Sequence, residues 1–254
     1  MAGGEAPVRQ RGVELRHVEE EVARVVGVLD VDAVRATYWR QNQFVHLERC
    51  LPPSLVEVFL AEVEQVRPAV HRNYVPRVKK GGSVSAFTLA SEAPAILALY
   101  RAPAWLDVLR RITGQPLGCC PERDPHACAL YFYTEPGDHI GFHYDTSYYR
   151  GARYTVLVGL IDRSSSRLVC QPFRGQPDRE PREIRLATEP GTLVLFNGDT
   201  LWHAITPLGE GEERVSLTLE YVTDPSMSRG RRFVSDMKDA IAYFGFRSVF
   251  GRRR

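Results

Sequence analysis

The sequence has no excess of charge of either sign and no long apolar run. Lysine and arginine number 33 against 31 aspartate and glutamate residues, so no overall field attracts a nucleic-acid backbone or an anionic membrane. No apolar stretch reaches the length of a membrane span, and residues 1–10 lack the apolar segment of a secretion signal. We therefore expect a cytoplasmic protein that does not bind membranes, and the sequence indicates no oligomeric state.

Cysteine is also scarce. The 254 residues contain five cysteines, an odd number, and none has Cys-x-x-Cys spacing. Because disulfide frameworks and zinc ribbons both need paired cysteines, we expect reduced thiols. The adjacent pair Cys119 and Cys120 has no role that the sequence indicates. The five are Cys50, Cys119, Cys120, Cys128 and Cys170.

The length suits one domain over residues 1–254. A chain of this size buries roughly 70 to 75% of the surface of its unfolded state, which is enough for a sizeable core. Apolar residues (44%) and charged residues (25%) have the proportions of a globular protein, and internal repeats are absent. Within the domain we expect a helical support region over 1–118, a β-rich core over 119–226, and a C-terminal helix with a basic tail over 227–254.

Helical patterns fill most of the first 118 residues. In residues 52–66, apolar side chains recur at the spacing of a one-sided helix. Residues 91–114 predict two successive helices, with Ser91 as the cap of the first and a break at Pro103. Between these segments, residues 77–85 have the lysine and glycine content of a mobile loop, so they predict either a lid or a solvated turn.

From Cys128 onward the pattern changes to short runs of β-branched, leucine and aromatic residues separated by turn residues. Eight such runs that close into two facing sheets are the parts of a jelly roll, the cupin-like double-stranded β-helix. We predict an α+β protein with a mostly β core, preceded by supporting helices and followed by a helix over 235–246. The predicted strands cover residues 128–134, 140–145, 153–162, 167–172, 183–187, 192–196, 202–206 and 214–222.

The second of these runs contains a histidine and an aspartate one residue apart. Side chains two apart on a strand point to the same side, so His143 and Asp145 share a face and Tyr144 lies on the other. Enzymes that activate oxygen hold iron(II) with two histidines and one carboxylate. The candidate for the second histidine is His203, in a later apolar run, and the alternative for His203 is a core histidine beside Trp202.

The run over 214–222 has two unlike faces. Its odd-numbered positions are apolar, whereas the even-numbered positions from Arg214 to Glu220 are polar. A polar face that lines the interior of a barrel implies a polar ligand, and the planar guanidinium of arginine suits a bidentate grip on a carboxylate. Taken alone, Arg214 would be interpreted as a surface arginine at the start of a strand.

The ordered set His143-x-Asp145, His203 and Arg214-x-Ser216 resembles the iron(II)/2-oxoglutarate-dependent dioxygenase superfamily. The segments YFYTEPGDHIGFHYD, RYTVLVGLID and EPGTLVLFNGDTLWHAITPL look like its prolyl-hydroxylase-like branch. The resemblance covers about residues 128–222, while the first 118 residues carry no motif of the superfamily.

The resemblance implies two groups of binding residues. One group would ligate Fe(II), and the other would hold the distal carboxylate of the cosubstrate 2-oxoglutarate. O2 would bind beside them, and 2-oxoglutarate would be converted to succinate and CO2, with ascorbate as a candidate reductant. The implied residues are His143, Asp145 and His203 for the metal, and Arg214, Ser216, Tyr133 and Tyr131 for the cosubstrate.

Two positions narrow the reaction. Asp145 stands where halogenating members have a small residue, which favours hydroxylation or a related oxidation. Glu220 stands where nucleic-acid demethylases have a second arginine, which argues against a nucleic-acid substrate.

We expect hydroxylation of a small molecule, such as a free amino acid or a biosynthetic intermediate. The alternatives are a prolyl-type hydroxylase of a protein and a jelly-roll protein that binds a metal without catalysis. Candidates for substrate contact, with packing as their alternative role, are Tyr148, Arg150, Arg153 and Trp202.

Overall fold

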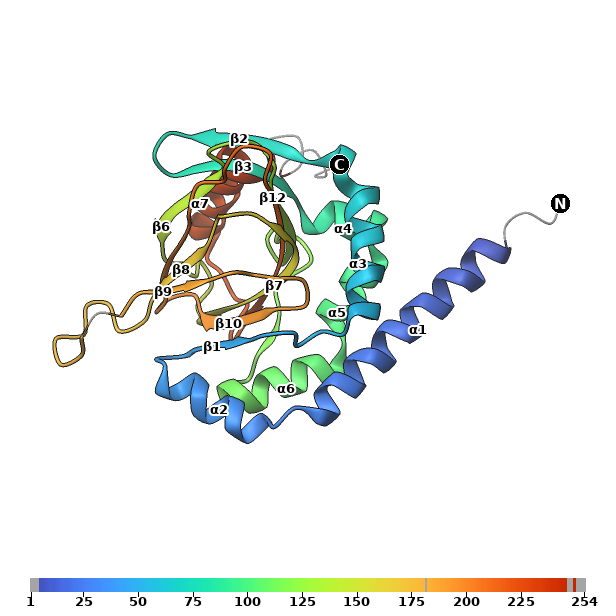
Figure 1. Cartoon of the computed structure of the whole chain (residues 1–254), viewed down its shortest axis with the longest axis horizontal. Helices are drawn as coiled ribbons and strands as arrows, with labels where there is room; N and C mark the ends of the chain where they lie inside the picture. Colours follow the sequence, from blue (N-terminus) through green and yellow to red (C-terminus); the bar gives the residue numbers. More distant parts are fainter. Residues whose placement is uncertain (1–4, 181, 246–248, 250–254) are drawn as a thin grey trace.

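The computed structural model describes residues 5–180, 182–245 and 249. It contains a curled antiparallel sheet with helices on its outer side (Figure 1). The described strands form one sheet of 12, in the main order β1-β10-β7-β12-β5-β3-β6-β11-β8-β9, with β2 paired to β3 and β4 paired to β12. This arrangement confirms the predicted double-stranded β-helix.

All eight predicted strands are present, and their ends differ from the predicted ones by at most two residues. The difference that matters is at β6, which ends at His143, so Asp145 lies in the segment after the strand. The strands are β5 (Cys128–Tyr133), β6 (His139–His143), β7 (Arg153–Arg163), β8 (Leu168–Gln171), β9 (Ile184–Leu186), β10 (Leu193–Asn197), β11 (Trp202–Ile205) and β12 (Glu213–Val222), with the short β4 (Gly118–Cys119) at the end of β12.

Strands also come from the first 118 residues, which corrects the prediction of a purely helical region there. β1 (Phe44–Leu47) pairs with β10, and β2 (His71–Val75) forms a hairpin with β3 (Lys79–Val84). β2 pairs along one edge of β3, and β5 and β6 pair one after the other along its opposite edge. The N-terminal region therefore supports the barrel and also completes it.

The prediction that residues 77–85 form a lid or a solvated turn was wrong, because most of this segment is β3. Its glycines are needed for close packing and not for mobility. A Cβ atom at Gly82 would lie 2.4 Å from Cγ1 of Val70, a distance that no real contact allows. A glycine-rich run is thus compatible with a central strand wherever another chain segment passes close to it.

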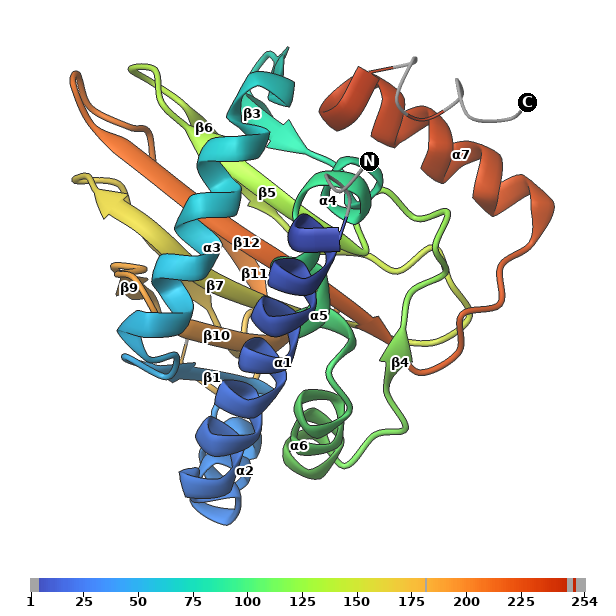
Figure 2. The same cartoon turned by 90° about the vertical axis from the view of Figure 1, so that its right-hand side faces the viewer.

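The helices pack on the outer face of the sheet, where Figure 2 shows α1 and α3 crossing the strands. The helix predicted over 52–66 is α3, and the two predicted over 91–114 are α5 and α6. Ser91 caps neither of them, because it lies in the last turn of α4, and α5 begins with Pro94. The helices are α1 (Glu5–Val28), α2 (Val31–Arg40), α3 (Pro53–Val66), α4 (Ala86–Glu92), α5 (Pro94–Arg101) and α6 (Pro103–Thr113).

The two faces of β12 explain how the barrel is built. Its odd-numbered side chains, from Val215 to Tyr221, are fully buried in the apolar core that the helices share with the sheet. Its even-numbered side chains Ser216, Thr218 and Glu220 line an interior cavity. One face therefore stabilises the fold by burial of apolar surface, and the other is available for a ligand.

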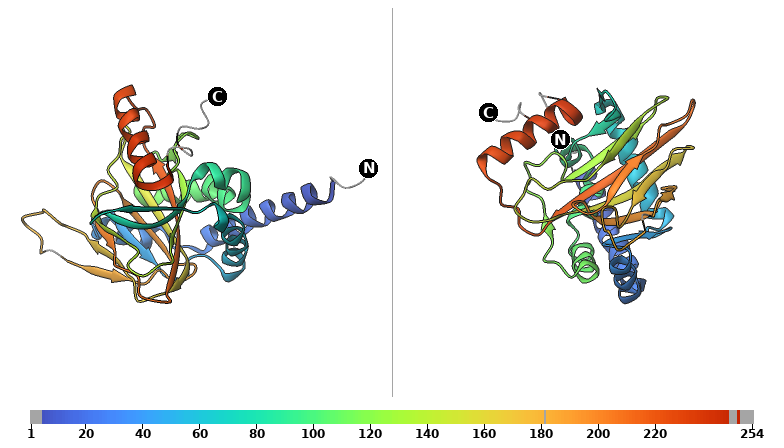
Figure 3. Two further views of the ribbon diagram at one scale, coloured as in Figure 1. Left: turned by 90° about the horizontal axis from the view of Figure 1, so that it is seen from above. Right: turned by 90° about the vertical axis from the view of Figure 1, so that its left-hand side faces the viewer.

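After β12 the chain forms α7 (Arg229–Asp239) and one turn of π-helix, η2 (Ala240–Phe244), which packs against β2 and β3. The predicted C-terminal helix thus starts six residues earlier than residue 235, and its predicted end at 246 and the basic tail lie outside the described residues. α7 and α2 lie at opposite ends of the molecule (Figure 3). No described helix is long and apolar enough to span a membrane.

Candidate metal centre and ligand cavity

Three side chains from β6, β11 and the segment after β6 converge at one point in the cavity. His143 and His203 are directly opposite each other in the antiparallel pairing of their strands. Their Nε2 atoms lie 3.2 and 3.8 Å from the two carboxylate oxygens of Asp145, and one potential ligand atom from each residue lies within 4.8 Å of the others. This is a two-histidine, one-carboxylate set of the kind that holds non-haem iron(II).

The backbone fixes which ring nitrogen of each histidine faces this point. Nδ1 of His143 lies 2.8 Å from the carbonyl oxygen of Gly141, and Nδ1 of His203 lies 3.1 Å from that of Leu201. A carbonyl oxygen can only accept a hydrogen bond, so Nδ1 is the donor in both rings. In the neutral imidazole, Nε2 then carries a lone pair directed at the metal position.

The charges of the three residues also suit a cation. Burial opposes ionisation of Asp145, but the adjacent His203 and His143 hold the pKa of its carboxyl well below its usual range. Burial lowers the pKa of His203 to about 4. Burial acts to lower the pKa of His143, but the hydrogen bond and the charge of Asp145, together with the carbonyl of Gly141, raise it overall. An ionised aspartate beside a neutral His203 provides the protonation states that metal ligation needs.

Asp145 is held by tertiary contacts, since it lies beyond β6. The hydroxyl of Thr155 on β7 donates to Oδ2 of Asp145 over 2.9 Å. Gly198 lets the two chain segments meet, because a Cβ there would lie 2.7 Å from the Cβ of Asp145. The assignment of Tyr144 to the opposite face was wrong: the strand alternation ends at His143, and Tyr144 lines the cavity with its ring 4.8 Å from that of Trp202.

The cavity has a volume of about 350 Å³ and is lined mainly by the inner faces of β5, β6, β7, β11 and β12. Its inner wall is apolar where Leu157, Leu168, Phe196 and Ile205 pack together. Lys238 of α7 and Tyr243 of η2 line it from the C-terminal segment. A space of this size accommodates a small organic molecule.

Arg214 pairs with Tyr133 and lies two residues before Ser216 on β12; these two neighbours line the cavity, and we call the end beside them the inner end. Arg214 itself is 0% exposed and is not among the lining residues. None of its three guanidinium nitrogens has a hydrogen-bond partner among the described residues. Its nearest carboxylate is Asp162 at 4.0 Å, which already accepts from Ser164 and from the backbone N–H of Thr188. The hydroxyl of Ser216 is also buried and unpartnered. Unpaired buried donors cost free energy, so this cluster fits an anionic ligand.

The two predicted tyrosines of β5 differ in their surroundings. Tyr133 pairs with Arg214 across the β5–β12 ladder and lines the cavity. Tyr131 pairs with Ser216, but its hydroxyl lies 2.9 Å from Nδ1 of His126, whose Nε2 lies 2.9 Å from Asp239. Tyr131 therefore belongs to a buried chain that joins the barrel to α7. His126 and Asp239 carry no local sequence signal, because the fold of the C-terminal segment brings them together.

The four candidates for substrate contact have unlike positions. Tyr148 lines the cavity, whereas Arg150 is exposed outside it. Trp202 stacks on Phe142 with ring centroids 6.0 Å apart, outside the residues that line the cavity. Arg153 lines the cavity, but its guanidinium is already engaged by Glu220.

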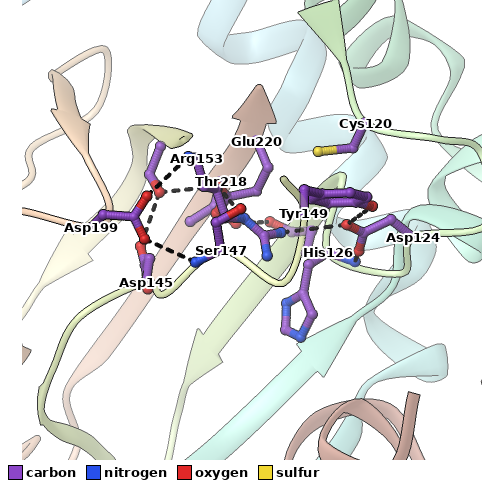
Figure 4. A network of polar contacts seen from close by, with 12 residues as sticks. Cys120, Asp124, His126, Asp145, Ser147, Tyr149, Arg153, Asp199, Thr218 and Glu220 are labelled. Carbon is purple, nitrogen blue, oxygen red and sulfur yellow. Dashed lines mark hydrogen bonds and ion pairs between the residues drawn. The ribbon is translucent and has the colours of Figure 1, made fainter. Parts of the chain in front are cut away.

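Arg153 belongs to a polar network beneath the metal position (Figure 4). Its Nε donates to Glu220 over 3.0 Å, and its Nη2 lies 3.6 Å from Asp124. Glu220 in turn lies 3.0 Å from the hydroxyl of Thr155, which also contacts Asp145. Burial raises the pKa of Glu220 to about 7. Arg153 therefore neutralises carboxylates of the protein, and its tie to Asp145 runs through Glu220 and Thr155.

No protein-family model and no curated protein matches the chain, whereas many solved structures do. The non-haem α-ketoglutarate (2-oxoglutarate) dependent epimerase SnoN from nogalamycin biosynthesis is 17% identical, with a TM-score of 0.62 over 76% of this chain and 80% of SnoN. A second structure of SnoN contains Fe3+, α-ketoglutarate and nogalamycin RO. A prolyl hydroxylase from Trichoplax adhaerens, bound to a peptide of a hypoxia-inducible factor, is 16% identical, with a TM-score of 0.57 over 89% of this chain and 96% of that one.

A prolyl-4-hydroxylase from Pseudomonas putida is 16% identical, with a TM-score of 0.53 over 77% of this chain and 100% of its own length. At these identities the likeness establishes the fold, which is the fold that the sequence resemblance implied. The chain has the double-stranded β-helix fold of the iron- and 2-oxoglutarate-dependent oxygenases.

Proposed function

We propose that the protein is a non-haem Fe(II)/2-oxoglutarate-dependent oxygenase that oxidises a small molecule, with release of succinate and CO2. The observation that carries this proposal is the presence, in one barrel, of a two-histidine, one-carboxylate cluster and a buried, unpartnered arginine. A barrel that only binds a metal has no need for the second feature. Leaving Arg214 unpaired costs stability, which a dicarboxylate ligand would offset.

The residues present fit both groups. His143, Asp145 and His203 would hold iron(II), which prefers this mixture of imidazole and carboxylate ligands. Arg214 and Ser216 would bind the distal carboxylate of 2-oxoglutarate with donors that have no other partner among the described residues. Bound iron, with 2-oxoglutarate, would supply the activation of O2 and the oxidative decarboxylation of the cosubstrate.

The protein's own contribution is to bind, orient and shield. The backbone carbonyls of Gly141 and Leu201 orient the two imidazoles, and Thr155 orients Asp145. The apolar wall around Leu157 and Phe196 excludes water from the space beside Arg214, which strengthens its interaction with a carboxylate. These groups set the position of the cosubstrate, and the open side of the metal position would then face the substrate.

A small-molecule substrate is supported by the size and the covering of the cavity. The volume of about 350 Å³ suits a compact molecule. Lys238 and Tyr243 of the C-terminal segment line the end of the cavity that lies toward α7 and η2, which we call the outer end. SnoN, whose structure holds nogalamycin RO, acts within the same fold. Hydroxylation is the outcome we propose, since Asp145 occupies the carboxylate position.

The test is the visible charge-transfer band of an iron(II)–2-oxoglutarate chelate, recorded without oxygen. We expect the band in the wild-type protein, its loss in Asp145→Ala, and a much weaker 2-oxoglutarate affinity in Arg214→Ala. Arg185→Ala, on the exposed side of β9, is the matched arginine control and should behave as wild type. Absence of the band from the wild-type protein would refute the proposal and favour a jelly-roll protein that binds a metal without catalysis.

A further inference from the structure

A second buried cation lies on the inner side of the barrel, on a strand that the sequence did not reveal. Lys79 of β3 is 2% exposed. Its ammonium group lies 5.0 Å from the ring centre of Tyr131 and 3.8 Å from that of Tyr243. Both rings line the cavity, as do the neighbouring Val78 and Lys238. The ammonium group therefore sits directly behind the aromatic wall of the outer end.

Nothing in the described part of the protein satisfies this ammonium group. Its Nζ has no hydrogen-bond partner among the described residues. Asp138 is the acidic residue whose charge favours the protonated form of Lys79. Its carboxylate already accepts hydrogen bonds from Arg72, over 2.7 Å, and from the backbone N–H groups of Thr134 and Glu135. Burial and the like charges of Lys238 and Arg72 lower the pKa of Lys79 to about 7.

The aromatic rings compensate only in part. A desolvated cation–π contact contributes about 2 kcal/mol, but a ring face does not replace the three hydrogen-bond acceptors that an ammonium group takes in water. Lys79 therefore destabilises the ligand-free protein, as Arg214 does. Buried, unpaired polar groups of this kind are found where a ligand completes them.

Lys79 and Arg214 occupy different subsites. The groups whose charges act on Arg214 are Tyr133, Asp162, Arg167 and Cys170. Those that surround Lys79 are Tyr131, Tyr243 and Lys238, at the end covered by α7 and η2. Because Arg214 at the inner end is assigned to 2-oxoglutarate, Lys79 at the outer end is available to bind the substrate.

We propose that Lys79 binds a carboxylate of the substrate, so that the substrate is an organic acid whose apolar body packs against the tyrosine rings of the outer end. This rests on the proposed function, which assigns Arg214 to the cosubstrate. A small displacement of the Tyr243 ring would bring the ammonium group into direct contact with the acid. The same ring covers the cation while the site is empty. The rings concerned are those of Tyr131, Tyr144, Tyr148 and Tyr243.

The experiment uses two pairs of probes that differ only in charge: benzoate with benzamide, and 3-phenylpropanoate with 3-phenylpropanamide. Each is titrated into the full chain loaded with Fe(II) and saturating 2-oxoglutarate without oxygen. Binding beside the metal shifts the visible band, whereas displacement of 2-oxoglutarate removes it. In the wild-type protein we expect at least one acid to bind at least tenfold more tightly than its amide.

Lys79→Met should remove that preference and leave 2-oxoglutarate affinity within about threefold of wild type. Lys80→Met is the matched control, because Lys80 is the next residue on β3, partly exposed, and its ammonium donates to the carbonyl of Pro136. This variant should retain the preference. Lys79→Met should also melt at or above the wild-type temperature, since methionine packs on the rings without a buried charge.

Four results would overturn the assignment. The first is that the wild-type protein prefers neither acid over its amide, and the second is that Lys80→Met loses the preference as fully as Lys79→Met does. The third is that Lys79→Met lowers the affinity for 2-oxoglutarate as much as an Arg214 variant does, and the fourth is that Lys79→Met melts several degrees below wild type. The third would give the carboxylate to the cosubstrate, and the fourth would make Lys79 a structural anchor for Tyr243. If the band never forms in the wild-type protein, the proposed function fails. If it forms and one of these four results is found, only the role of Lys79 fails.

Discussion

The two ends of the cavity are built in different ways. The inner end, around Arg214, is made by strands of the barrel that lie next to one another, chiefly β5, β7 and β12. The outer end combines the turn between β2 and β3, the segment after β6, and the C-terminal segment α7–η2. Each end holds one buried cation without a hydrogen-bond partner in the described residues.

The difference shows which elements of the fold each end depends on. The inner end follows from the pairing of strands that the fold shares, so the chemistry located there depends on the barrel alone. The outer end depends on segments that pack onto the barrel from outside it, such as Lys238 and Tyr243. Changes at the two ends should therefore affect different measurements.

The largest effect is expected where the two ends meet, at the metal position. Asp145→Ala removes the only carboxylate of the three-residue cluster. Because loss of an outer partner of a metal ligand alone costs 10- to 100-fold in metal affinity, we expect iron(II) affinity to fall by more than about 100-fold. Iron titration monitors this, with the exposed Asp178→Ala as control. Equal iron binding by the two variants would remove the basis of the metal centre.

The second prediction separates the two cations. Arg214→Met should weaken 2-oxoglutarate by at least roughly 30-fold, since truncation of one partner of a buried charge pair costs about 2 to 5 kcal/mol. Iron binding should persist, because Arg214 is not among the clustered ligands. Calorimetric titration of 2-oxoglutarate into the manganese-loaded protein provides the measurement. A loss of iron affinity in Arg214→Met would mean that the two ends are not independent.

The third prediction concerns stability and pH. The pKa of Lys79 is about 7 in the folded protein and near 10.4 in an unfolded chain, so between these values the unfolded state binds more protons and folding gains stability as pH rises. Below pH 7 both states are charged and the full cost is present. Lys79→Met lacks this cost, so its advantage over wild type should be on the order of 5 kcal/mol below pH 7 and should vanish above about pH 10.5.

Urea unfolding of Lys79→Met and wild type at pH 6, 7.5 and 9 measures this difference. The other titratable and charged groups near the ammonium are the same in both proteins, so the comparison reports the charge of Lys79 together with its coupling to them. These groups are Tyr131, Tyr243, Lys238, Arg72 and Asp138. A stability difference that stays constant over this range would show that Lys79 is charged at every pH in the folded protein.

The smallest effect is expected at the support of the metal ligand. Thr155→Val keeps the shape of the side chain but removes its hydrogen bond to Asp145. We expect iron(II) affinity to fall by about tenfold, at the lower end for outer partners of a metal ligand. Thr155→Ser restores a hydroxyl and should recover most of the affinity. If the Thr155→Val and Thr155→Ser variants bind iron with equal affinity, the orientation of Asp145 is set by the backbone alone.

Much of the inner end could be predicted from the sequence, because its residues lie at fixed offsets within single strands. Arg214 and Ser216 share a face for the same reason that Val215 lies on the other. Asp145 was grouped with His143 by the same rule, although it lies after the strand and is positioned by Thr155. The alternation rule therefore placed Asp145 beside His143 correctly, although the strand does not extend to Asp145. The same rule placed Tyr144 on the wrong face.

The outer end could not be predicted, because no periodicity links its residues. Lys79 lies in a run whose glycines indicate a loop, and the run is a strand because it pairs with β2, β5 and β6. His126 and Asp239 meet across 113 residues of chain. Such contacts depend on how whole elements pack, which is information that a local pattern does not contain.

The position of β1 and β3 in the barrel wall also constrains how the protein folds. Phe44 on β1 pairs with Phe196 on β10, so the first strand has no partner until most of the chain is available. Closure of such distant pairs is slow, and unpaired strand edges are exposed to other chains in the meantime. We expect refolding at high protein concentration to lose material to aggregation. A fragment that ends before β10 would leave β1, the end strand of the described sheet, without the strand it pairs with.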